Sequence, residues 1–123
     1  MNTLELLEKH DKAASIVKQF YLDKMMESVK SDELPDNFKE FIKAQDFDNS
    51  QIAKIIDGNP RTLFDVFDQY ELFVETLYME HAFHFTITNG NEVLETNIKT
   101  YKTRVECDRA AVEAAMERLN NSL

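Results

Sequence analysis

The spacing of apolar residues changes once along this chain, from a helical period to a period of two. Between Leu63 and Leu77 apolar residues recur at steps of three and four, as on the buried face of a helix. From Phe83 to Thr88 they alternate with polar residues, as on a half-buried strand. A chain that holds both patterns is neither all-α nor all-β. The sequence therefore predicts a mostly helical α+β fold.

Helices are expected to fill the chain before the alternating segment. The first runs from a cap at Thr3 to about Lys30, with an apolar side made of Leu6, Leu7, Ala13, Ala14, Val17, Phe20, Tyr21 and Met25. A short second helix is predicted over SDELPDNFKEFIKAQ, whose proline suits a first turn. A short third helix is predicted from caps at Asp48 to Ser50 to a stop at Gly58.

The fourth helix is predicted from Pro60 to about Glu80, with Asn59 as its cap, and its periodicity is the clearest in the chain. One side of it carries the apolar stripe, so we expect it to be the central core helix. The opposite side is acidic and also carries two apolar residues, Leu72 and Met79. These two residues are either covered by another helix of the same chain or exposed to a partner.

An antiparallel β-hairpin is predicted around Asn89-Gly90. A two-residue loop would place Ile87 opposite Glu92. A four-residue loop over 89–92 keeps more apolar residues on one face, so we favour it, with the pairs Ile87–Leu94, Phe85–Thr96 and Phe83–Ile98. A hairpin alone is marginal in water and has open edges, so it needs covering helices or a second chain.

The last helix is predicted to begin at a capping box, Thr103 to Glu106. Its apolar stripe is Val105, Val112, Ala115, Met116 and Leu119. The single cysteine, Cys107, lies beside two carboxylates that disfavour a thiolate, so we expect it to fill space in the core. The full prediction is one globular domain over 1–123 with four helices, two of them short, then a hairpin and a C-terminal helix.

Composition narrows the class of protein. The chain has 123 residues, two glycines, two prolines and one cysteine, which is typical of a compact domain without disulfides. No apolar run is long enough to span a bilayer and the first residues do not resemble a signal peptide, so we expect a cytoplasmic protein. The net charge of −9 argues against direct binding to nucleic acid or to an anionic membrane.

Enzyme chemistry finds little support in the sequence. His81 and His84 would share a metal on a helix but point to opposite faces of a strand, and the alternation favours the strand. DFDNSQIAKIID has the carboxylate spacing of a calcium loop but lacks its glycine and its final glutamate. We find no catalytic motif. The sequence therefore predicts no catalytic residue, no metal and no cofactor.

Acidic charge is concentrated in one segment. From Asp57 to Glu80 the chain has one base, Arg61, and six acids, a net charge of −5. An acidic face with embedded apolar anchors suits a basic protein partner. The predicted partner-binding residues are Asp65, Asp68, Glu71, Leu72, Glu75 and Met79.

The leading hypothesis is therefore a small non-catalytic protein that regulates or inhibits a protein partner. In its narrower form, the carboxylates imitate nucleic-acid phosphates and occupy the basic groove of a nucleic-acid-binding protein. In size and charge the chain resembles small acidic phage-encoded inhibitors of host enzymes. A structural subunit that self-associates into a homo-oligomer is the alternative, and a metal-dependent enzyme is the third.

Overall fold

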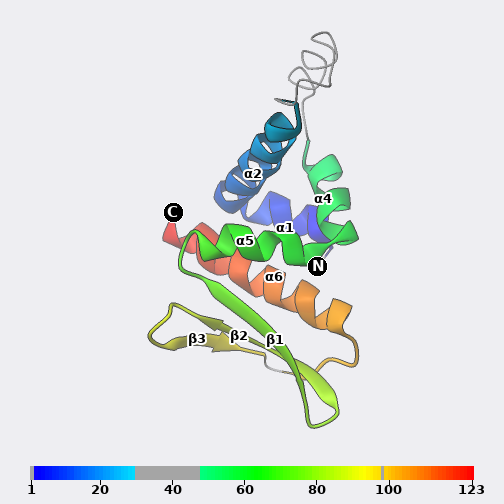
Figure 1. Cartoon of the computed structure of the whole chain (residues 1–123), viewed down its shortest axis with the longest axis vertical. Coiled ribbons are helices and arrows are strands. Elements are labelled where there is room, and N and C mark those ends of the chain that lie inside the picture. Colours follow the sequence, from blue (N-terminus) through cyan, green and yellow to red (C-terminus); the bar gives the residue numbers. More distant parts are fainter. Residues whose placement is uncertain (1, 30–47, 98) are drawn as a thin grey trace.

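The computed structural model describes residues 2–29, 48–97 and 99–123 and has an α+β fold (Figure 1). A group of helices lies at one end and an antiparallel sheet at the other. The elements are α1 (Thr3–Lys9), α2 (Asp11–Val29), α4 (Asn49–Gly58), η1 (Pro60–Thr62), α5 (Leu63–Asp68), β1 (Phe73–Met79), β2 (Ala82–Thr88), β3 (Val93–Thr96) and α6 (Arg104–Ser122). Among the described helices, none combines the length and apolarity needed to cross a bilayer.

The predicted first helix is two helices, because the chain turns at His10. Asn2, not Thr3, caps α1, and its side chain accepts a hydrogen bond from the Glu5 N–H at 2.8 Å. The first turn of α2 is capped from the other end of the chain, since Asn120 Oδ1 accepts from the N–H groups of residues 12 and 13 at 3.0 and 3.1 Å. The apolar side is confirmed for Leu6, Leu7, Ala13, Ala14, Val17 and Tyr21, which are buried.

The third predicted helix is confirmed as α4. Asp48 and Gln51 form a reciprocal capping box, with bonds of 2.9 and 3.3 Å, and the helix ends at Gly58 as expected. The second predicted helix, over SDELPDNFKEFIKAQ, lies outside the described residues.

The predicted helix from Pro60 to Glu80 is wrong in its second half. Helix α5 ends at Asp68, and the next residues close a C-terminal motif in which Leu72 N–H bonds to the Phe67 carbonyl at 3.0 Å and Glu71 N–H bonds to the Asp68 carbonyl at 3.2 Å. Glu71 adopts a φ of 59° in the position that glycine usually occupies. Because Glu71 and not glycine occupies this position, the end of the helix could not be recognised from the residue types.

The segment that follows forms β1, so the predicted hairpin is a three-stranded antiparallel sheet in the order β1-β2-β3. Val74 pairs with Ile87 and Thr76 with Phe85 on the face toward α6, where Ile87 and Phe85 are buried. We call this the inner face. Residues 73, 75, 77 and 79 of β1 point to the opposite, outer face.

The β2–β3 connection confirms the four-residue loop over 89–92, and Asn89 N–H bonds to the Glu92 carbonyl at 3.2 Å. The predicted register is wrong by one residue beyond Thr88. Thr88 pairs with Val93, but a bulge shifts Ile87 opposite Glu95. A bulge places an extra residue in one strand, and the alternation of apolar residues does not reveal it.

Helix α6 lies between the sheet and the other helices (Figure 1) and contacts β1 and β2 as well as α2 and α5. Its cap at Thr103 is confirmed, since the hydroxyl accepts from Glu106 N–H at 3.2 Å. Cys107 is fully buried, as predicted, whereas Val105 is exposed and does not belong to the stripe. The remaining stripe is confirmed by the burial of Val112, Ala115, Met116 and Leu119.

Candidate functional site

The six predicted partner-binding residues do not share one helix face. Asp65 and Asp68 are exposed on α5, and Glu71 lies in the turn that ends it. Leu72 is 8% exposed and belongs to the core, so it is not a surface anchor. Glu75 and Met79 lie together on the outer face of β1.

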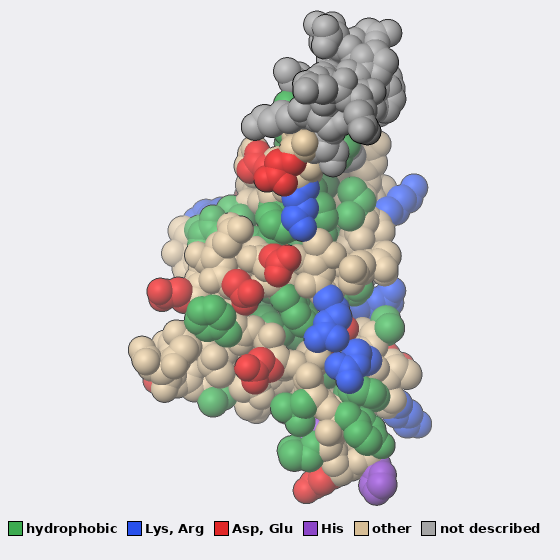
Figure 2. Space-filling view, viewed as in Figure 1, with side chains coloured by type: hydrophobic (Ala, Val, Ile, Leu, Met, Phe, Trp, Pro, Cys, Tyr) green, Lys and Arg blue, Asp and Glu red, His purple; other side chains and the backbone are tan. Residues whose placement is uncertain are grey.

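The outer face of β1 presents an apolar surface with one carboxylate. Phe73 is 36% exposed, Leu77 38% and Met79 52%, and Glu75 stands between the first two. We call these four residues the β1 surface. Figure 2 shows hydrophobic side chains at the sheet end of the molecule, with acidic and basic side chains beside them. A cluster of large exposed apolar side chains marks an interaction surface more often than scattered ones do.

The two edges of the sheet differ in how they are protected. Strand β3 is short, contains a bulge, and receives the Arg118 side chain, which donates to the Leu94 carbonyl at 2.6 Å and to Glu95 at 2.8 Å. Strand β1 has seven residues in unbroken register with β2 and only one charged side chain, Glu75. Natural proteins block sheet edges with charges, bulges and short strands, and of these devices β1 has only the single charge of Glu75. No described residue forms a strand along the outer edge of β1, so this edge is the candidate for pairing with another chain.

Backbone strain is concentrated at both ends of β1. Within the described ranges, three residues other than glycine have positive φ: Glu71 before the strand, and Glu80 and His81 after it, at 59°, 55° and 64°. The last two form the two-residue turn to β2, where both φ values have the sign that a type I′ turn requires. Such residues cost stability and cluster at functional sites. The strain supports the choice of β1 as the candidate site.

Negative charge flanks the β1 surface on the side of α5. Burial raises the pKa of Asp68 above its ordinary value, and the nearby Asp65 carboxylate raises it further. The one base of this segment, Arg61, is exposed, but its Nη2 donates to Thr76 Oγ1 at 3.3 Å and its Nε lies 3.8 Å from the buried Asp108 carboxylate. Within the part of the chain that the structure describes, Asp65, Asp68, Glu71 and Glu75 form no ion pair, so they can interact with groups outside the chain.

His81 and His84 lie in different parts of the hairpin formed by β1 and β2. His81 is exposed in the β1–β2 turn. His84 is on β2, with Nε2 3.2 Å from the Met79 carbonyl and Nδ1 3.4 Å from the Asn97 amide nitrogen. The described residues contain no group of three potential metal ligands.

The residues whose spacing resembles a calcium loop serve other roles where they are described. Asp48 caps α4, Ser50 lies within that helix, and Asp57 accepts a hydrogen bond from Thr3 Oγ1. Asp46 lies outside the described residues.

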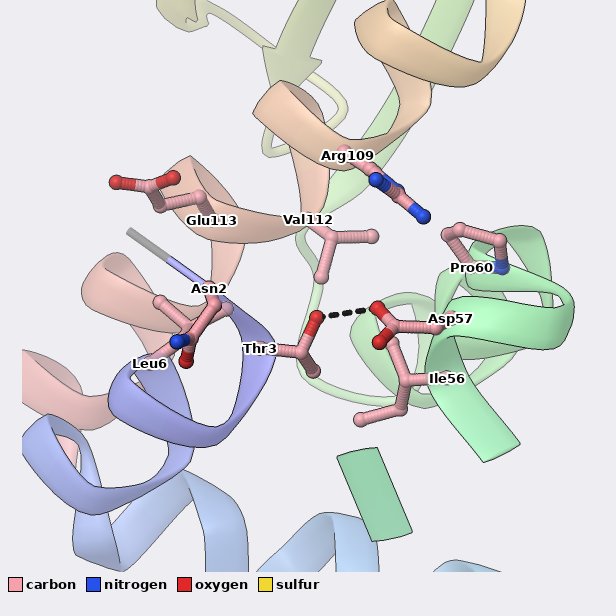
Figure 3. Close-up of a pocket in the computed structure, with 9 residues that line it drawn as sticks. All are labelled: Asn2, Thr3, Leu6, Ile56, Asp57, Pro60, Arg109, Val112 and Glu113. Carbon is pink, nitrogen blue, oxygen red and sulfur yellow. Dashed lines mark hydrogen bonds between the residues drawn. The ribbon is translucent and has the colours of Figure 1, made fainter. Parts of the chain in front are cut away.

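A small cavity lies where α1, α4 and α6 meet (Figure 3). Its volume is about 130 Å³, its apolar wall includes Ile56 and Val112, and the Thr3–Asp57 hydrogen bond crosses it. Arg109 and Glu113 stand on opposite sides of the opening (Figure 3). Ligand pockets usually measure about 300–1,000 Å³. We interpret this cavity as a junction between helices.

Comparison of the chain with protein-family models, with curated proteins and with solved structures finds no match. The site therefore has to be judged on its own residues. Sequence reasoning missed Phe73 and Leu77, because it assigned both to the buried stripe of a helix. The signal that could have found them is the composition of FVETLYM, which is rich in β-branched and aromatic residues.

Proposed function

We propose that this protein is a small, acidic, non-catalytic binding protein that regulates or inhibits a protein partner docked on β1. The observation that carries the proposal is the β1 surface: three exposed apolar side chains aligned on an edge strand that has one charged residue and, among the described residues, no strand paired to its outer edge. An extended segment of the partner would pair with the free edge and cover these side chains, which is a common mode of peptide recognition.

Charge complementarity indicates what kind of partner fits. The chain has a net charge of −9, and Glu75 lies within the β1 surface, with Asp65, Asp68 and Glu71 close by in sequence. A basic partner would gain from these carboxylates, mainly in the rate and specificity of association. The narrower proposal, that the carboxylates imitate phosphates, applies when that partner is a nucleic-acid-binding protein.

Self-association through the same edge is the second candidate, and the residue pattern of β1 supports it. In an antiparallel pair of two β1 strands centred on Thr76, Glu75 of one copy would face Leu77 of the other, so the two carboxylates would not be directly opposed. Repulsion between two chains of charge −9 works against this pairing.

The test is affinity capture of the tagged protein from a lysate of its own cells, at low and at high salt. Three proteins are compared: the wild type, Leu77→Asp, and the control Ile55→Asp on α4. The control is matched, since Leu77 and Ile55 are 38% and 39% exposed. We expect wild type and control to retain a basic protein at low salt and the Leu77→Asp variant to lose it.

Charge reversal at Asp65, Asp68 and Glu75 should weaken capture and flatten its salt dependence. If the captured protein binds nucleic acid, added DNA should compete for it under the mimicry proposal. Equal capture by Leu77→Asp and Ile55→Asp, or capture of nothing except other copies of the chain, would remove the support for docking on β1.

A further inference from the structure

A second open space lies between the sheet and α6, lined by β2, β3 and the segment after β3 and so away from β1. It is a groove of about 410 Å³, within the range of ligand pockets. Two aromatic rings line it, Phe85 from β2 and Tyr101 from the segment after β3, with centroids 6.5 Å apart. On α6 the lining residues Ala110 and Ala114 are small, which leaves space beside the half-buried Tyr101 ring, while Phe85 forms the buried floor of the groove.

Carboxylates surround the opening of this groove. Glu113 and Glu117 lie one helical turn apart on α6, so they are neighbours on its surface. Both are exposed and neither has a hydrogen bond or ion pair with another described residue. Glu95 is the third carboxylate, but it is already bound to Arg118 at 2.8 Å.

The side chain of Lys99 already places a positive charge in this groove. Lys99 lines it and holds its Nζ 5.7 Å from the centroid of the Tyr101 ring, within the range of a cation–π contact. The surroundings also disfavour a further negative charge. Burial, and then the nearby Cys107 and Glu113, raise the pKa of the Tyr101 hydroxyl above its ordinary value.

We propose that the groove between the sheet and α6 binds a small alkylammonium cation, with its apolar chain on Phe85 and Tyr101 and its ammonium group between Glu113 and Glu117. The proposal is independent of docking on β1. Lys99 would compete with the ligand for the face of Tyr101, so the site would be partly blocked by the chain itself. Displacement of an exposed lysine is a small cost, because its ammonium group can return to water.

In the test, the protein is titrated with 1,4-diaminobutane. Binding is measured by calorimetry and by the NMR shifts of the Phe85 and Tyr101 rings. The double variant Glu113→Gln with Glu117→Gln should weaken binding by about tenfold, because it removes both exposed carboxylates that would pair with the ammonium group. Lys99→Met should tighten binding by about two- to fivefold, because it removes the competing cation while keeping an unbranched side chain.

Two controls separate this site from general attraction to an acidic protein. The double variant Glu8→Gln with Glu27→Gln removes the same charge from exposed positions on α1 and α2 and should bind like the wild type. The neutral analogue 1,4-butanediol should bind at least tenfold more weakly than the diamine. Equal weakening by the two double variants, no shift of the two rings, or weaker binding by Lys99→Met would each overturn the proposal.

Discussion

At the scale of single residues, the backbone conformations around β1 make the most specific claims. Glu71, Glu80 and His81 all have positive φ, and none of them is the glycine or asparagine that such positions favour. These residues form the turns at the two ends of β1, and their positive φ values lower the stability of the protein. Variants that relieve the strain should therefore be more stable than the wild type.

Glu71→Gly tests this at the end of α5. Glycine at a positive φ should raise the free energy of unfolding by about 0.5–1 kcal/mol, because the native conformation no longer strains a side chain. Urea denaturation measures the change. The matched control is Gly90→Ala in the β2–β3 loop, where φ is 95° and the new methyl group would meet Phe73 at an ordinary 3.7 Å. That variant should be destabilised by about 1 kcal/mol. A less stable Glu71→Gly would contradict the conformation described here.

The turn between β1 and β2 gives a second prediction. Replacing Glu80-His81 by Asn-Gly should stabilise the protein by about 1 kcal/mol or more, since Asn-Gly is the preferred type I′ sequence. Thermal unfolding followed by circular dichroism measures it. If the segment were helical, as its apolar period indicates, the same change would place glycine inside a helix and lower the melting temperature instead.

Tyr21 predicts how stability depends on alkaline pH. Burial raises the pKa of its hydroxyl from 10.0 to about 12, so the unfolded chain ionises first as the pH rises. The contribution is fully present below pH 10.0 and is lost as the pH rises toward about 12. The Tyr21 hydroxyl is buried and has no hydrogen-bond partner among the described residues, so Tyr21→Phe should be at least as stable at pH 8. From pH 8 to pH 11, it should lose less stability than the wild type in urea titrations.

At the scale of elements, the sequence correctly predicted those helix ends, apolar stripes and loops that are specified by residues close together in the chain. The caps at Asp48 and Thr103, the stop at Gly58, the stripe of α6 from Val112 to Leu119 and the four-residue loop are confirmed. Each depends on a residue type with one strong local preference.

The helix-to-strand change at β1 could not be predicted in the same way. FVETLYM places apolar side chains on both faces of the strand, so the period of two is hidden and the spacing also fits a helix. The turns at either end contain neither glycine nor asparagine. The predicted binding residues consequently include Leu72, which is buried, and omit Phe73 and Leu77, which are exposed on β1.

The contrast between the two sheet edges is also testable. Arg118→Ala should expose the β3 edge, because the Leu94 carbonyl and Glu95 both lose their donor. Hydrogen exchange of the β3 amides should become faster, and the free energy of unfolding should fall by about 1 kcal/mol. Arg104→Ala, which removes a contact with the Phe83 ring on β2, serves as the control and should leave β3 exchange unchanged. Unchanged β3 exchange in Arg118→Ala would mean that this edge is not protected as proposed.

At the scale of the whole molecule, charge distinguishes the two ways in which β1 can be used. Binding to a basic partner should weaken as salt screens the attraction, whereas pairing of two chains of charge −9 should strengthen as salt screens the repulsion. Analytical ultracentrifugation of the purified protein in about 0.05 and 0.5 M salt measures the second effect. We expect a monomer at both salt concentrations. A dimer that grows with salt and disappears in Leu77→Asp would favour the self-associating subunit.

The most direct test of docking on β1 is photocrosslinking in the protein's own cells. A photoreactive phenylalanine derivative replaces Leu77 in one variant and Ile55 in the other, two positions of nearly equal exposure on different elements. If a basic partner docks on β1, we expect a crosslink from position 77 to one basic protein, identified by mass spectrometry, and no such product from position 55. Equal products from both positions, or a product from position 77 that contains only a second copy of this chain, would contradict it.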